Sequence, residues 1–208
     1  MMTTAYFITA FVTLFVIVDP VGLTPLFAAL TQGMSAARRR AIAIRACVIA
    51  FGILALFSLF GEAVLGFVGI SMPAFRIAGG VLLFLTALDM LFERRTKRRE
   101  DQAEEEDERP DPSVFPLAIP LIAGPGAIAT VILLAGQNPG VPGLVTALGV
   151  ALSVIVVVFA FFLTAGLLER LLGRTGINVV TRLLGMLLAA LSVQFVLDGL
   201  RAYGFGPA

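Results

Sequence analysis

One carboxylate stands inside a long apolar run, in the stretch VIVDPVGLTPLF at residues 16–27. Asp19 is followed at once by Pro20, and then by Gly22 and Thr24. Proline removes a backbone hydrogen bond and glycine lowers the cost of unwinding, so we expect a helix to break here. The carboxylate could then bind a cation, which would be an ammonium group, Na⁺ or a proton. The alternative is that Asp19 caps the half-helix that begins at Pro20.

A second stretch, PLIAGPGAIATV at residues 120–131, has the same kind of helix breakers without a charge. We expect a new half-helix to begin at Pro125, because proline fits the first turn of a helix. The first amides of such a helix and the positive end of its dipole can receive an anion such as a carboxylate. The residues expected to form this anion site are Gly124, Pro125, Gly126, Ala127 and Ile128.

Together the two breaks predict a site that accepts both a carboxylate and an ammonium group, as a zwitterion requires. Their neighbours are small and apolar, which favours a small neutral amino acid as the substrate. Gln194 in the last apolar run is expected to line the cavity or to form an interhelical hydrogen bond. Arg76 and Arg182 lie near the ends of their runs, where a gating role and an interfacial anchor are both open.

The surrounding composition predicts an all-α membrane protein. Of the 208 residues, 59% are hydrophobic and 14% are charged. Continuous apolar runs of about 20 residues match the thickness of a bilayer when they are helical, and a barrel would show alternation instead. Six runs meet this length: they are 4–30, 46–67, 74–92, 115–134, 144–167 and 180–200.

Basic residues predict the orientation of these runs. Of the 15 Lys and Arg residues, only Arg76 and Arg201 would fall outside if the N-terminus is outside. By the positive-inside rule, both termini are therefore expected outside the cell. The segment 93–112 alternates basic and acidic blocks, and we interpret it as a cytoplasmic linker. The expected division is residues 1–92, a linker over 93–113, and residues 114–208.

The two halves resemble each other at a nearly constant offset. The matching pairs, 105 to 107 residues apart, are Pro20 with Pro125, Arg76 with Arg182, Gly79 with Gly185, and Glu62 with Glu169. Because each half has three runs, the second half would enter the membrane from the opposite side. The sequence thus predicts two inverted three-helix repeats with broken helices 1 and 4, an arrangement typical of secondary transporters.

Other classes of function fit this composition less well. The chain has no histidine and one cysteine, Cys47, which argues against a metal or haem site and against the usual serine or zinc proteases. Asp19 is the only acidic residue near the middle of a run, so no pair of catalytic carboxylates is expected. We expect no enzyme, metal, cofactor or nucleic acid partner, and we expect membrane lipid around the chain. A channel or a structural membrane subunit stays an alternative, and a homo-oligomer stays open.

The segments DPVGLTPLF, AIPLIAGPGAI, RIAGGVLLFLTALDML and TRLLGMLLAALSVQFVLDGL resemble the MarC family, also called the neutral amino acid transporter family. This family lies within the lysine-exporter-like superfamily. The resemblance covers essentially the whole chain and depends on the two break motifs in combination. It implies a bacterial or archaeal inner-membrane protein that exports or exchanges small neutral amino acids, with Na⁺ or H⁺ as candidate coupling ions.

Overall fold

A computed structural model describes residues 4–92, 94, 111–137 and 140–205. Within these ranges the chain is helical and contains no strand, which confirms the all-α prediction. The elements are α1 (Thr4–Val18), α2 (Pro20–Leu30), α3 (Ala36–Val68), α4 (Met72–Leu91), η1 (Ser113–Ile122), α6 (Pro125–Gln137), α7 (Val141–Leu163) and α8 (Ala165–Ala202).

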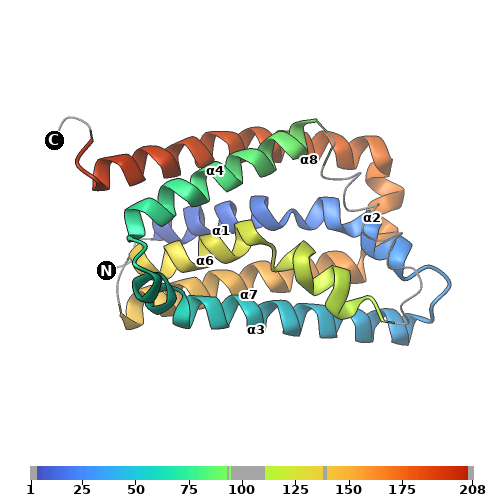
Figure 1. Cartoon of the computed structure of the whole chain (residues 1–208). Coiled ribbons are helices and arrows are strands. Elements are labelled where there is room, and N and C mark those ends of the chain that lie inside the picture. The colour runs from blue at the N-terminus through green and yellow to red at the C-terminus, as the bar shows by residue number, and fades with distance from the viewer. Residues whose placement is uncertain (1–3, 93, 95–110, 138–139, 206–208) are drawn as a thin grey trace.

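These helices lie along one another in a single bundle (Figure 1). The helices α4 and α8 pack together on one side of the bundle, α3 and α7 pack together on the other, and α1, α2, η1 and α6 lie between them. The beginning of α1 and the end of α8 lie at the same end of the bundle, which we call the terminal end. Five helical stretches are long and apolar enough to cross a membrane, and the bent pair of η1 and α6 brings the number to six.

Helix boundaries differ from the predicted runs where polar residues continue a helix. The helix α3 begins at Ala36, ten residues before the predicted start, because Ser35 caps it by accepting a hydrogen bond from the amide of Arg38. The predicted end of the fifth run at Leu167 is wrong, since α7 ends at Leu163. The helix α8 bends at Gly173, whose φ of 60° suits glycine, and the part that can span a membrane begins at Thr175.

The segment η1 is less regular than the sequence suggested. Phe115 and Ile119 have extended backbone angles inside it, and each stands directly before a proline, Pro116 or Pro120. A proline disfavours the helical region for the residue that precedes it, so two prolines four residues apart prevent a regular α-helix. The first part of the fourth span is therefore an irregular coil, and only α6 continues as an α-helix.

Close packing between α4 and α8 relates the two halves of the chain. A β-carbon at Gly80 would lie 2.8 Å from the carbonyl oxygen of Ser192 and 3.0 Å from the nitrogen of Val196. A β-carbon at Gly185 would lie 3.3 Å from the carbonyl oxygen of Ala87 and 3.4 Å from the nitrogen of Leu91. The two contacts are related by an offset of 105 residues: Gly80 corresponds to Gly185, Ala87 to Ser192, and Leu91 to Val196. An internal two-fold axis would produce such a reciprocal pair of contacts.

Some contacts of the other helices follow the same exchange of halves, whereas the contact of α6 with α7 has no counterpart of similar extent between α2 and α3. The helix α2 packs against α8 while α6 packs against α4, and α1 packs against α7 while η1 packs against α3. These contacts support the inverted repeat, which stays a prediction along with the division at residues 93–113. Most of that linker, residues 93 and 95–110, lies outside the described residues.

Candidate functional site

The first break is a single residue wide. Asp19 adopts the left-handed conformation, with φ 57° and ψ 66°, and separates α1 from α2. Asparagine and aspartate tolerate this conformation better than other residues with a β-carbon. Pro20 has no amide hydrogen, so the carbonyl of Val16 loses the donor that a continuous helix would supply. The predicted break in the first span is therefore confirmed at Asp19 and Pro20.

The carboxylate of Asp19 is fully buried and turns toward the beginning of α2. Its Oδ1 atom accepts a hydrogen bond of 3.0 Å from the amide of Gly22, and its carbonyl oxygen accepts one of 3.0 Å from the amide of Leu23. This is the geometry of a helix N-cap, in which a negative charge also faces the positive end of the helix dipole. The capping alternative is thus present in the structure, and contact of Asp19 with a solute stays a prediction.

The second break has no side-chain cap. A β-carbon at Gly124 would lie 2.5 Å from the carbonyl oxygen of Pro120, so the chain turns here too tightly for any other residue. Pro125 begins α6, as the sequence predicted. The half-helix therefore begins with its N-terminal amides directed at the break.

One of the three amides assigned to the anion site is already used. The amide of Ile128 donates a hydrogen bond of 3.0 Å to the carbonyl oxygen of Gly124, so its prediction as a free donor is wrong. This bond closes the first turn of α6, which a helix makes wherever its geometry is regular. Within the described residues, the amides of Gly126 and Ala127 have no hydrogen-bond acceptor. Of the three amides predicted to bind an anion, those of Gly126 and Ala127 are therefore the two that remain.

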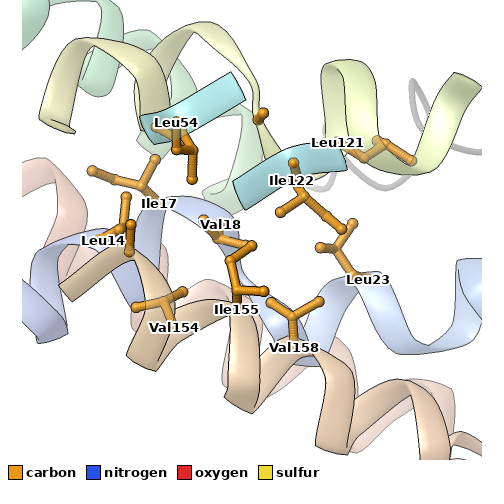
Figure 2. Packing of buried hydrophobic residues seen from close by; sticks show 14 of the residues in the cluster. Leu14, Ile17, Val18, Leu23, Leu54, Leu121, Ile122, Val154, Ile155 and Val158 are labelled. Carbon is orange, nitrogen blue, oxygen red and sulfur yellow. The ribbon is translucent and has the colours of Figure 1, made fainter. Parts of the chain in front are cut away.

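The structure brings the two breaks together. A β-carbon at Gly126 would lie 3.2 Å from the Cγ2 atom of Ile17, two residues before Asp19, and 3.2 Å from the Cδ2 atom of Leu83. Figure 2 shows Val18 and Ile122, which precede the two breaks, among the apolar side chains that fill the space around them. The two half-helix ends therefore lie next to each other, with Asp19 and Pro20 buried and Pro125 exposed.

Hydroxyl groups near the breaks bond to their own helices. Thr24 donates a hydrogen bond of 2.8 Å to the carbonyl oxygen of Pro20, and Thr130 donates one of 2.8 Å to that of Gly126. Both side chains are fully buried. Each threonine thus lies one turn inside its half-helix and supplies an acceptor oxygen near the break, which a solute could use.

Gln194 is not brought to the breaks. Its exposed side chain donates a hydrogen bond of 2.8 Å to Oδ1 of Asp198, one turn along α8. The buried face of this helix carries Gly185, Leu188 and Ser192. Gln194 follows Ser192 by two residues, which places it on the opposite side of the helix. The prediction that Gln194 lines the cavity does not hold in this structure.

The two arginines singled out in the sequence lie in different surroundings. Arg76 is partly buried on α4, and its Nε atom has no hydrogen-bond partner within the described part of the chain. Arg182 is exposed on α8. With the structural offset of 105, the counterpart of Arg76 is Thr181, which is buried. By the contacts of Gly80 and Gly185, Arg76 thus corresponds to Thr181 and not to Arg182, while the repeat itself stays a prediction.

Two further contacts escaped the sequence reasoning because they join segments far apart in the chain. Asp111 forms an ion pair with Arg45 of α3 and accepts a hydrogen bond of 3.0 Å from the amide of Ser113. Hydrogen bonding from Ser113, together with the charge of Arg45, lowers the pKa of the Asp111 carboxyl below its usual range. Phe27 of α2 stacks on Phe162 of α7, with ring centroids 4.2 Å apart.

Comparison with known proteins identifies relatives over nearly the whole chain. The model of the MarC family of integral membrane proteins matches residues 4–203. A UPF0056 membrane protein of Aquifex aeolicus is 40% identical over 197 residues, which are 94% of this chain and 92% of the relative. The UPF0056 membrane protein YvbG of Bacillus subtilis is 36% identical over 200 residues, or 95% of each chain.

A third relative, the UPF0056 inner membrane protein YhgN of Escherichia coli, is 37% identical over 197 residues. These residues make up 94% of this chain and 96% of the relative. No solved structure matches the chain significantly.

Proposed function

The chain belongs to the MarC family of integral membrane proteins, and from this premise we propose that it is a secondary transporter of small neutral amino acids. It would export or exchange them by alternating access. The observation that carries the proposal is that the breaks of two spans lie next to each other. Breaks of this kind place helix ends at the middle of a membrane, where transporters bind their solutes.

The chemistry of the two helix ends favours a zwitterion. The amides of Gly126 and Ala127 are suited to a carboxylate, because hydrogen bonds and the helix dipole both favour negative charge there. Asp19 supplies the only described acidic group at the breaks, and its carboxylate is suited to an ammonium group or to a coupling ion, Na⁺ or H⁺. The buried side chains around the breaks are apolar, which favours a solute with a neutral side chain over one with a charged side chain.

A cellular setting accompanies this function. We place the chain in the inner membrane of a bacterial or archaeal cell, in line with the printed name of the Escherichia coli relative. Both termini would face outward, and residues 93–112 would face the cytoplasm. Membrane lipid surrounds the bundle in this proposal, and the chain acts in transport and not as an enzyme.

Counterflow in proteoliposomes tests the proposal. Vesicles preloaded with unlabelled alanine should accumulate external labelled alanine transiently, since a carrier couples the two fluxes. Ethylamine, which lacks the carboxylate of alanine, and propionate, which lacks the ammonium group, should each compete much less well. Empty liposomes serve as the control. Equilibration of label at the same rate with and without preloading would indicate a channel, and no flux of any neutral amino acid would refute transport of this class.

A further inference from the structure

Two buried polar atoms without partners lie at corresponding places in the two halves. Within the described residues, three side-chain atoms are buried and form no hydrogen bond, and two of them, Nε of Arg76 and Oγ1 of Thr181, lie at corresponding places; the third is Oγ of Ser113. The two residues are 105 apart, the same offset that relates the reciprocal contacts of Gly80 and Gly185. Native proteins leave few buried polar groups unpaired, and each such group calls for a reason. Two unpaired groups at corresponding positions suggest a shared reason.

Arg76 lies on the face of α4 that packs against α6. Gly79 and Leu83 follow it by three and seven residues, which puts all three on one side of the helix. A β-carbon at Gly79 would lie 3.3 Å from the Cδ1 atom of Leu133 on α6, and Leu83 reaches Gly126 at the start of α6. Arg76 therefore lies about 10 Å along the seam between α4 and α6 from the level of the second break.

This seam begins at the terminal end of the bundle. The helix α4 begins there, at Met72, and α6 ends there, at Gln137 (Figure 1). A β-carbon at Gly136 would lie 2.5 Å from the terminal methyl carbon of Met72, so the two helices are in close contact at this end. A solute that moves along the seam from this end passes Arg76 before it reaches the amides of Gly126 and Ala127.

Arginine at this place selects the charge of the solute group that it meets. Its planar guanidinium donates to both oxygens of a carboxylate and repels an ammonium group. Thr181 holds the corresponding place on α8, which packs against α2, and it offers a hydroxyl without charge. The two corresponding places therefore differ in chemistry although their helices are related.

We propose that Arg76 forms an entrance site for the carboxylate of a solute, on the seam between α4 and α6 and before the central amides. The inference rests on the proposed function for the identity of the solute as a small amino acid. It adds a second carboxylate site in series with the first. Binding at Arg76 would bring the carboxylate in first, and the amides of Gly126 and Ala127 would then receive it.

A binding measurement on the purified full-length protein tests Arg76 without transport. Propionate and ethylamine are the probes, and the thermal midpoint is followed as each concentration rises, with chloride salts at matched ionic strength. Propionate should stabilise the wild type and Arg201→Gln, which removes an exposed arginine at the same end of the bundle. Arg76→Gln should lose the part of this stabilisation that Arg76 contributes, so that the same shift requires more propionate, because only the amides of Gly126 and Ala127 then remain to bind it; Arg76→Lys should lie between the two. Any effect of ethylamine, whose ammonium group is suited to Asp19 and is repelled by Arg76, should be the same in the wild type and in all of these variants.

Equal stabilisation of the wild type and Arg76→Gln by propionate would overturn the proposal. Stabilisation of the wild type by phosphatidylglycerol and not by propionate would also overturn it, since Arg76 would then bind lipid. Alanine counterflow separates this inference from the proposed function. Loss of propionate binding in Arg76→Gln supports the entrance site even if the wild type exchanges no neutral amino acid, and unchanged binding overturns it even if exchange is active.

Discussion

Replacement of Asp19 separates its two roles, because the structure shows it as a helix cap while the proposed function also needs its charge. Asn at position 19 keeps a side-chain oxygen for the amide of Gly22 and tolerates the left-handed conformation. Gly is the residue that the second half carries at the corresponding position, Gly124, and it also tolerates this conformation. Ala neither caps the helix nor fits the conformation.

The structure gives the expected order of stability. Asp19→Ala loses a cap that contributes about 1 kcal/mol and also loses the side-chain oxygen that makes the left-handed region tolerable for Asp, at a cost of up to about 1–2 kcal/mol. Together these amount to at most about 2–3 kcal/mol. Asp19→Gly should lower the free energy of unfolding by only about a few tenths of a kcal/mol, because glycine is a tolerable N-cap residue and adopts the left-handed conformation without strain. Asp19→Asn should remain close to the wild type, so Ala alone should unfold at a clearly lower temperature.

The expected order of exchange is different. If the carboxylate binds an ammonium group or a coupling ion, Asn and Gly both remove that contact. A hydrogen bond to a charged group contributes about 1.5–3 kcal/mol, which corresponds to a loss of more than about tenfold in exchange. Initial rates of alanine exchange and thermal midpoints would be measured for all three variants in the same lipid. Full exchange by Asp19→Asn would refute a role for the charge and leave Asp19 as a cap.

Three further predictions concern packing, acid stability and topology. Gly80→Ala should lower the thermal midpoint by the equivalent of about 1–3 kcal/mol, because its β-carbon would lie 2.8 Å from a backbone oxygen, while Gly52→Ala, with open space around it, should not. Asp111→Asn should remove a stabilisation that is present at neutral pH and lost as the pH falls through the lowered pKa of this carboxyl. Because the ion pair is exposed, the loss should be under about 1 kcal/mol in a pH series of thermal midpoints. A cysteine introduced within residues 93–112 should resist an impermeant thiol reagent in intact cells, and rapid labelling would contradict the proposed orientation.

The two breaks could be predicted because their causes are local. Proline next to Asp19 and the glycines around Pro125 act on the backbone within one turn, whatever packs around them. The irregular η1 also has a local cause, the pair Pro116 and Pro120, and the sequence reasoning overlooked it. The bond of the Ile128 amide to Gly124 has a local cause as well, since a helix that begins at Pro125 makes this bond in its first turn, and the sequence reasoning overlooked it.

Orientation of side chains around a helix was the harder problem. Gln194 was expected inside because it is polar and lies mid-span, but burial is decided by which face packs against a neighbour. Gly185, Ser192 and Gly199 recur every seven residues and mark the face that packs against α4. That spacing puts Gln194 on another face of α8. The spacing of the small residues therefore indicated the exposed position of Gln194, whereas its polar side chain alone did not.

The register between the halves shows the same difficulty. An offset of 106 pairs Arg76 with Arg182 by residue type, whereas the packing of α4 on α8 gives 105 and pairs Arg76 with Thr181. Identity of residue type was misleading because a related fold conserves the place of the backbone and leaves the side chain free to differ. The small residues at the helix contact are the safer guide to register, since a β-carbon there would meet backbone atoms.

In the proposed function, a difference between the halves would make the central site suitable for a zwitterion. Two related half-helices that both begin at proline would present two positive ends, and such a pair would favour a solute with two negative groups. Asp19 stands where the second half has Gly124, and its carboxylate compensates the positive end of α2. The end of α6 has no such group, so its amides stay available to an anion. The difference between Asp19 and Gly124 would thus give the two ends opposite preferences, as the proposed amino acid substrate requires.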